Sequence, residues 1–301
     1  LKKIKCLSSR ENKARVREKV IIIDELRHEY RLQDILAFDG MPRSTFYYQL
    51  KHLYDEDKHT EEKEVIAQIF KENKGRYGYR RITMEMRNRG YSINHKTVRK
   101  LMHSCGVKCE IRRHKYRSYK GSVGKVAPNI LNRNFAATKP NQKWVTDVTE
   151  FNVRGGKVYL SPILDLFNGE IVSYNISLHP VFHQVMDMLD KAFEKIPNTN
   201  ETILHSDQGW QYQMKRYQRI LKEHGIIQSM SRKGNCLDNS VMENFFGLLK
   251  TEMFYKHEFT STEHLISEIE TYIDYYNNKR IKCKLKGLSP VQYRIQSTRA
   301  A

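Results

Sequence analysis

The chain has 301 residues, enough for two or more folded domains, and its formal net charge is +19. Apolar residues make up 39% of it, which supports a core, yet no apolar run is long enough for a membrane span. Residues 1–140 carry a net charge of +17 and residues 141–301 only +2. One-sided basic charge is typical of nucleic-acid binding, although a solvated basic surface is the alternative.

The first helical elements lie within residues 1–55. Residues 11–30 read as a charged helix, and its apolar stripe consists of Val16, Val20, Ile23 and Tyr30. Residues 32–50 then read as helix, break and helix, with the break in DGMPRS and Ser44 as the predicted N-cap of the second helix. The pattern is typical of a helix-turn-helix unit.

A second helical unit follows at residues 61–105, with helices predicted at 62–72, 80–89 and 94–103. In its last helix the predicted buried side consists of Val98, Leu101 and Met102, and the outward cations are Lys96, Arg99 and Lys100. A helix that presents cations on one side is suited to a DNA groove. An ordinary three-helix unit with a solvated basic face is the alternative.

A basic stretch joins this unit to the rest of the chain. Residues 96–139 contain twelve Lys or Arg residues and one acid, Glu110. We expect its densest part to lie on a phosphate backbone through Arg112, Arg113, Lys115 and Arg117. A disordered, solvated tether is the alternative reading.

The five cysteines are scattered and odd in number, which fits a reducing cytoplasm better than a disulfide framework. Two of them belong to an H-x-C-x3-C-x4-H pattern formed by His103, Cys105, Cys109 and His114. This spacing is atypical of zinc sites, so we expect no zinc and instead small cysteines packed at a helix end.

The pattern changes at about residue 141. Strands are predicted at 143–153, 157–166, 170–178, 201–206 and 226–230, and helices at 181–195, 211–224, 240–255 and 262–278. Meandering strands followed by alternating helices and strands predict an α/β fold, with a mixed sheet covered by helices.

Three carboxylates interrupt or follow these elements: Asp147 in KWVTDVTEF, Asp207 in ILHSDQGWQY and Glu243 in NSVMENFFGLLK. Acids at the ends of different elements can converge, and two like charges about 4 Å apart repel by roughly 4 kcal/mol at an effective dielectric of 20. A divalent cation removes that repulsion and adds Lewis acidity. The sequence therefore points to metal-assisted phosphate chemistry.

Each of the two aspartates also has a structural alternative. Asp147 shares a strand face with Val145 and Phe151, so a hydrogen bond to Thr149 would satisfy it, and Asp165 is a rival on the same logic. Asp207 follows a buried strand, where open α/β sheets place ligands, but it also fits an Asx-turn. His205 is expected to be a hydrogen-bonded core histidine.

Glu243 has a structural alternative as well, because Ser240-Val241-Met242-Glu243 matches a capping box. The rest of the predicted helix favours a site instead. Glu243, Gly247 and Lys250 share a face distinct from the apolar one, and a glycine there lets a ligand come close. Acid, small residue and cation in one stripe suit a surface that binds metal and DNA.

The chain resembles the second-frame (orfB) transposases of the IS-three insertion-sequence family, which are D-D-E recombinases of the retroviral-integrase superfamily. The resemblance runs from about residue 40 and rests on RSTFYYQL, GRYGYRRITMEMRNRG, NHKTVRKLM, WVTDVTEF, HSDQGWQY, SRKGNCLDNSVMENFFGLLKTE and LKGLSPVQYR. The acid spacing together with the block 231–250 is highly specific. LKGLSP departs slightly from the usual small-residue version.

The resemblance implies an RNase H-like integrase core, a mixed five-stranded sheet with flanking helices, preceded by all-α helix-turn-helix units. Asp147, Asp207 and Glu243 match the family's metal-binding triad, which would hold two Mg²⁺ or Mn²⁺ ions. Lys250 matches a basic residue seven positions after the glutamate, and we expect DNA contacts from Arg232, Lys233 and Lys250. The implied reaction cuts DNA at the element's ends and transfers the freed 3′-OH to another phosphodiester.

We expect a helical region at 1–55, a second helix-turn-helix domain at 56–110, a basic linker at 111–139, a catalytic core at 140–280 and a tail at 281–301. The expected partners are double-stranded DNA (terminal inverted repeats and target), further copies of the chain, and an upstream-frame protein fused by frameshifting, which would account for the Leu1 start. The alternatives are a helix-turn-helix regulator without catalysis and a nuclease of the same fold that only hydrolyses.

Overall fold

The computed structural model describes residues 13–53, 57–109, 126–197, 199–232 and 235–299. The chain divides into two compact units, Leu1–Glu62 and Lys63–Ala301. In the first unit the helices are α2 (Lys13–Leu26), α3 (Leu32–Asp39) and α4 (Arg43–Lys51). Their apolar residues form one small core consisting of Val20, Ile23, Ile35, Leu36 and Phe46.

Two details predicted for the first unit are wrong. Tyr30 lies beyond the end of α2, and it is 55% exposed rather than part of the buried stripe. Ser44 is not the N-cap of α4, because the cap is Pro42, two residues earlier, and no side-chain hydrogen bond caps the helix there. Proline suits a helix start, since its missing N–H would have no partner inside the helix anyway.

The helix α5 (Thr60–Glu72) crosses the boundary between the two units, and α6 (Tyr79–Asn88) and α7 (His95–Ser104) follow it in the second unit, close to the predicted helices. Asn94 caps α7 as expected, because its Oδ1 accepts a hydrogen bond of 2.8 Å from the Lys96 amide. The buried residues of α7 are Val98, Leu101 and Met102, as the apolar spacing predicted.

A mixed sheet of six strands forms the centre of the second unit within the described residues. The strands are β1 (Lys143–Thr146), β2 (Thr149–Val153), β3 (Gly156–Asp165), β4 (Ile171–Ser177), β5 (Ile203–Ser206) and β6 (Ile227–Met230). β1 and β2 both pair with β3, so together they correspond to the single strand predicted at 143–153, interrupted at residues 147–148. If the two are counted as one strand, the sheet has the expected five strands. β4 flanks β3, whereas β5 and β6 follow β1 in parallel.

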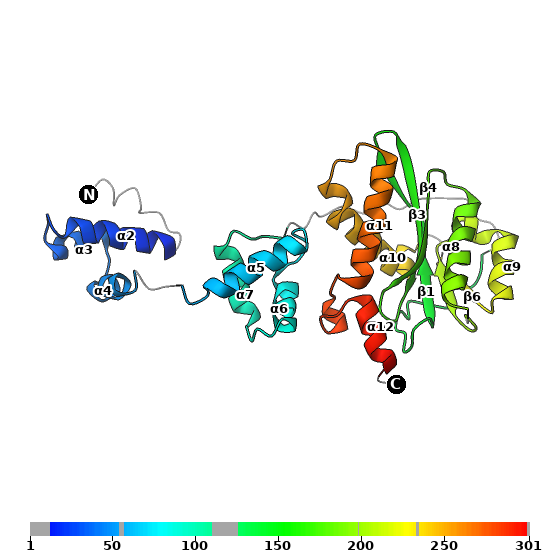
Figure 1. The fold of residues 1–301 in the computed structure, drawn as a ribbon, viewed down its shortest axis with the longest axis horizontal. Helices are drawn as coiled ribbons and strands as arrows, with labels where there is room; N and C mark the ends of the chain where they lie inside the picture. Colours follow the sequence, from blue (N-terminus) through cyan, green and yellow to red (C-terminus); the bar gives the residue numbers. More distant parts are fainter. Residues whose placement is uncertain (1–12, 54–56, 110–125, 198, 233–234, 300–301) are drawn as a thin grey trace. The chain divides into compact units, whose positions relative to one another are not determined.

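Helices cover both faces of this sheet (Figure 1). On one face lie α8 (Phe182–Lys195) and α9 (Lys215–Glu223), and on the other α10 (Ser240–Glu252) and α11 (Thr262–Asn278). Strand residues alternate between the two cores. Trp144 belongs to the core under α8, and Val145 to the core under α10. The predicted mixed α/β fold with flanking helices is thus confirmed.

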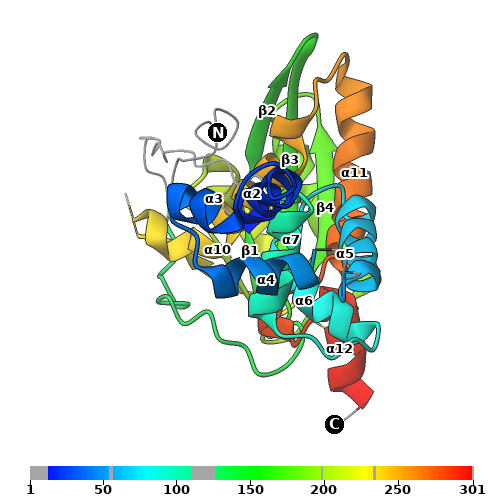
Figure 2. The same ribbon diagram turned by 90° about the vertical axis from the view of Figure 1, so that its left-hand side faces the viewer.

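The last residues form α12 (Pro290–Arg299), which lies near one end of α11 in both ribbon views (Figures 1 and 2). This helix packs on the turn between β3 and β4. Arg294 pairs with Glu170 at 3.0 Å, and the Asn168 side chain donates to the Pro290 carbonyl at 2.9 Å. The segment predicted as a tail therefore includes a packed helix. None of the described helices is long and apolar enough to cross a membrane.

Candidate active site

Two neighbouring parallel strands bring the two aspartates together. Within the ladder of β1 and β5, Val145 lies beside His205. Extending this register by two residues places Asp147 beside Asp207, on strands about 4.8 Å apart. Both residues follow the carboxyl ends of their strands, where α/β sheets place ligands.

Backbone amides orient both carboxylates. The Oδ1 atom of Asp147 accepts from the Val148 amide at 2.8 Å, and the Oδ1 atom of Asp207 accepts from the Gly209 amide at 2.8 Å. A Cβ atom at Gly209 would lie 2.9 Å from that Asp207 oxygen, so a larger residue there would displace the carboxylate. The predicted Asx-turn exists, and it occupies one oxygen of Asp207 rather than excluding a site.

Glu243 lies in the first turn of α10, and Asn239 holds that turn near β1. The Asn239 side-chain amide donates to the Thr146 carbonyl at 3.3 Å, directly before Asp147 in the chain. Asn239, rather than Ser240 as the capping-box pattern predicted, is the N-cap of α10, and its side chain makes no capping bond. The Oδ1 atom of Asn239 is buried, and no hydrogen-bond partner for it lies in the described part of the chain.

The charges of Asp207 and Glu243 both act on Asp147. Burial raises the pKa of Asp147 well above its ordinary value, and the charges of Asp207 and, more weakly, Glu243 raise it further. Burial also raises the pKa of Asp207. The positive charge of Lys250 lowers the pKa of Asp147 but does not outweigh these effects.

The donor set fits a hard divalent cation, although its members do not stand in coordinating geometry. No three His, Cys, Asp or Glu side chains among the described residues are placed so as to hold a metal ion. The site nevertheless offers three carboxylates and the unpartnered amide oxygen of Asn239, which are the oxygen ligands that Mg²⁺ and Mn²⁺ prefer. A cation would relieve the mutual repulsion that raises the pKa of Asp147.

The outer face of α10 continues the site. Gly247 is exposed, and a Cβ atom added to it would meet nothing within 4 Å. One turn further on, the half-buried Lys250 places its Nζ atom 5.2 Å from the centre of the Phe151 ring. Burial lowers the pKa of Lys250, while the charges of Glu150 and Asp147 raise it. Acid, open backbone and cation thus follow one another along this helix.

Two residues near the triad are structural. His205 is fully buried, and its ring nitrogens contact the hydroxyls of Ser229 at 2.9 Å and Ser231 at 3.2 Å, as expected for a core histidine. Asp165 pairs with Trp144 and therefore lies nearer the opposite end of β1. Its carboxylate accepts from the amides of residues 141 and 167, so the structure gives no support to Asp165 as a rival.

The predicted DNA-contacting cations have different surroundings. On α7 the side chains of Lys96, Arg99 and Lys100 are all exposed. Tyr79 and Arg80, which were not predicted from the sequence, extend this surface. The Tyr79 ring lies 5.9 Å from the Arg99 guanidinium, and its hydroxyl accepts a hydrogen bond of 3.2 Å from Arg80. The remaining residues predicted to contact DNA from the linker and the loop lie outside the described part of the chain: Arg112, Arg113, Lys115, Arg117 and Lys233.

Arg232 is engaged within the protein. Its guanidinium makes two bonds of 3.0 Å to the carboxylate of Asp238, a fully buried residue that also accepts from Arg133 at 2.8 Å. These hydrogen bonds hold the pKa of Asp238 far below its usual range. Since the Arg232 side chain remains 52% exposed, it braces the loop before α10 while one side of it faces solvent.

The sequence matches three family descriptions. Residues 137–236 and 243–298 match an integrase core domain, and residues 56–115 match an HTH-like domain. The first integrase match includes Asp147 and Asp207, and the second begins at Glu243.

Several insertion-sequence proteins are similar over most of their length. A putative transposase, InsK, for the insertion sequence element IS150 of Escherichia coli K12 is 55% identical over 92% of this chain and 98% of its own. The transposase InsF for IS3A of the same organism is 34% identical over 76% of this chain and 80% of its own. The HTLV-2 integrase catalytic core, solved in complex with magnesium, matches 52% of this chain and 97% of its own at 17% identity and a TM-score of 0.42.

Proposed function

Because the chain belongs to the insertion-sequence transposases with an integrase core domain, we propose that it cuts DNA at the ends of its element and joins the freed 3′-hydroxyls to target DNA. The observation that carries this proposal is the position of Asp147 and Asp207 at the carboxyl ends of the paired strands β1 and β5, with Glu243 of α10 close enough for its charge to raise the pKa of Asp147.

Asp147, Asp207 and Glu243 are the proposed ligands of two Mg²⁺ or Mn²⁺ ions, with Asp147 between the other two. When bound, such ions supply the Lewis acidity that activates a water molecule or a 3′-hydroxyl for in-line attack. The protein's part is to orient the carboxylates through the amides of residues 148 and 209. Lys250 adds a positive charge beside Asp147, where a phosphate would lie.

Double-stranded DNA, with both terminal repeats and target, is the proposed substrate. The exposed cations of α7 bind the terminal repeats in this proposal, and the family match to an HTH-like domain supports it. Joining two ends to a target requires several active sites, so we expect the active assembly to contain more than one copy. An upstream-frame protein or a frameshift fusion is a further expected partner.

The test is strand cleavage and joining on a labelled terminal repeat with Mg²⁺. Asp147→Asn, Asp207→Asn and Glu243→Gln are each expected to abolish joined products, while binding to the repeat survives. Asp190→Asn, at an exposed acid of α8, is the matched control and is expected to keep wild-type activity. Full joining by any of the first three variants would remove that residue from the triad.

The same assay separates the alternatives. Repeat binding without metal-dependent nicking by the wild-type protein would indicate a regulator, and nicked ends without joined products would indicate a nuclease. Inverted repeats and an overlapping upstream frame in the flanking DNA would support the proposed class independently.

A further inference from the structure

Residues 75–81, GRYGYRR, form the loop between α5 and the start of α6, and we call them the docking segment. Two of its side chains are almost fully buried: Arg76 is 6% exposed and Tyr77 is 1% exposed. A buried arginine in a basic, DNA-binding region is unexpected, because a cation that reads phosphate needs to face solvent. The partners of these side chains lie far away in the sequence.

The arginines of the docking segment hold the last residue of α10. Arg76 donates from its Nε atom to the Glu252 carbonyl at 3.1 Å, a contact between residues 176 positions apart. Its guanidinium also stacks on two rings of α11, at 4.6 Å from Tyr275 and 5.3 Å from Tyr272. Arg81 places a nitrogen 3.4 Å from the Glu252 carboxylate.

The negative charge of the Glu252 carboxylate is already balanced by residues outside the docking segment. Arg280, 2% exposed, binds it with two nitrogens at 2.6 and 2.8 Å, and the Tyr272 hydroxyl donates to it at 3.0 Å. A buried carboxylate that is fully bonded in this way has a single orientation. It therefore offers the docking segment a fixed target at the end of α10.

Tyr77 completes the contact on the other side of the segment. Its hydroxyl accepts from the Ile281 amide at 3.0 Å and donates to the Lys279 carbonyl at 3.3 Å. Ile281 in turn belongs to the apolar core of α5, α6 and α7, together with Ile66 and Ile82. The core of these helices thus includes a side chain from beyond α11.

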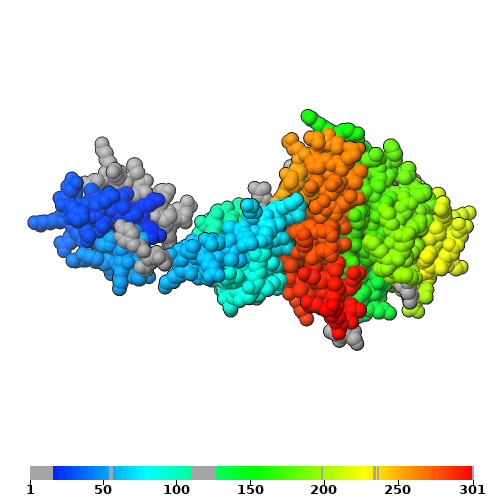
Figure 3. Space-filling view, viewed as in Figure 1, coloured from blue at the N-terminus to red at the C-terminus, as the bar shows by residue number. Residues whose placement is uncertain are grey.

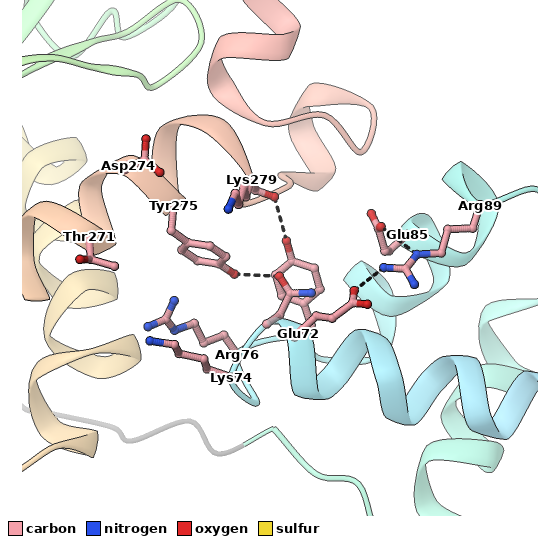
Figure 4. A pocket seen from close by; sticks show the side chains of 11 residues that line it. Glu72, Lys74, Arg76, Glu85, Arg89, Thr271, Asp274, Tyr275 and Lys279 are labelled. Atoms are coloured by element: carbon pink, nitrogen blue, oxygen red, sulfur yellow. Dashed lines mark hydrogen bonds and ion pairs between the residues drawn. The ribbon is translucent and has the colours of Figure 1, made fainter.

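A cavity of about 420 Å³ lies next to this contact (Figure 4). Across it, the Tyr275 hydroxyl donates to the Asn73 side chain at 3.1 Å, and Arg89 pairs with Glu72 within the helical part. In the space-filling view the surfaces of α5 and α11 adjoin (Figure 3). The docking segment is therefore not the whole connection, since the Asn88 side chain of α6 also donates to the Gly287 carbonyl at 3.1 Å.

From these contacts we infer that the docking segment couples the DNA-binding helices to the catalytic site through α10. This inference rests on the proposed function. Glu243 lies near the start of α10 and Glu252 is its last residue, so the two are nine residues, or about 13.5 Å, apart along one rigid helix. A DNA end held by α7 is thereby held at a fixed position relative to Glu243, so the docking segment sets where the strand is cut.

The test uses the full chain with Arg76→Met and Arg81→Met combined, which leaves the Glu252–Arg280 pair intact so that the sheet and its helices still fold. The first readout is hydrogen exchange, which needs no activity. We expect the Ile281 amide to exchange at least 10-fold faster in the variant, with the amides of β1 and β5 unchanged. Arg89→Met is the matched control, because this arginine pairs with Glu72 and Glu85 of the same helices.

The second readout is binding and cleavage of a labelled terminal repeat. The variant is expected to bind within about threefold of wild type but to cut at least 10-fold more slowly, or at several positions. Unchanged exchange at Ile281 would overturn the tie itself, and faster exchange with wild-type cutting would overturn the coupling. If the wild-type protein cut no DNA, the proposed function would fail, and the exchange result would still decide whether the tie exists.

Discussion

Replacing Gly247 with alanine is expected to stabilise the protein. Glycine inside a helix is about 0.8–1.0 kcal/mol less favourable than alanine. Because a Cβ atom at Gly247 would meet nothing within 4 Å beyond its chain neighbours and the backbone of its own helix, no clash offsets this gain. The expected increase in unfolding free energy is therefore about 1 kcal/mol, or roughly 2–4 °C in Tm for a unit of this size.

A glycine that the fold does not need at an exposed helical position points to a ligand that approaches the backbone. Gly247 lies between Glu243 and Lys250 on one face of α10, where we propose that DNA binds. A leucine there would keep DNA away from that face, so Gly247→Leu is expected to reduce strand transfer at least 10-fold, equivalent to about 1.4 kcal/mol. Alanine, which is smaller, is expected to reduce it less.

The assay pairs thermal unfolding with the yield of joined DNA. Ser267→Ala, at an exposed position of α11, is the control, since it also gains helix propensity but lies on a different helix. Wild-type joining by Gly247→Leu would refute the close approach of DNA. A Gly247→Ala variant no more stable than wild type would refute the open space around that position.

Three further predictions concern single charges. Lys100→Gln is expected to weaken binding to all DNA sequences alike and to reduce the salt slope of affinity by about 1, as measured by titrations at several salt concentrations. Burial lowers the pKa of Lys282 from 10.5 to about 7, with smaller contributions from the charges of Arg280 and Arg81, while the charge of Glu170 raises it. Between these values the unfolded state binds more protons, so stability rises with pH, and the advantage of Lys282→Met in Tm is expected to be larger at pH 6 than at pH 10. Asp238→Asn is expected to lower the free energy of unfolding by about 3 kcal/mol at pH 7. Because the folded state holds the pKa of this carboxylate low, the wild-type protein loses the advantage as the pH falls below about 4, which urea unfolding at pH 7 and below pH 4 measures.

Local patterns predicted most of the fold. Apolar periodicity located most helices and strands to within a few residues, because burial on one face repeats with the geometry of the element, but it did not predict α12. The same alternation placed Asp147 on the face of Val145 and Phe151, and both of these residues lie in the core beneath α10. The pairing of Asp147 with Asp207 then follows from strand register, which the sequence does not state directly.

Contacts between distant residues were not predictable in this way. GRYGYRR has no periodicity that distinguishes a docking loop from a DNA-binding one, and its partner Glu252 lies 176 positions after Arg76. The hydrogen bonds of Arg232 to Asp238 were not predicted for the same reason. Its pairing with Asp238 depends on how the loop before α10 folds back, and an arginine beside a lysine looks like a phosphate contact in the sequence.

The net charge of the first 140 residues therefore overstates how many cations face DNA. Arg76 and Arg81 point to Glu252, Arg89 binds two glutamates of its own helices, and Arg133 binds Asp238. Each phosphate contact contributes about 0.9 to the salt slope of affinity, and internally paired cations contribute nothing. The slope for terminal-repeat binding should therefore follow the exposed cations of α7 and its neighbours, and it should be well below the value that the charge of +17 suggests.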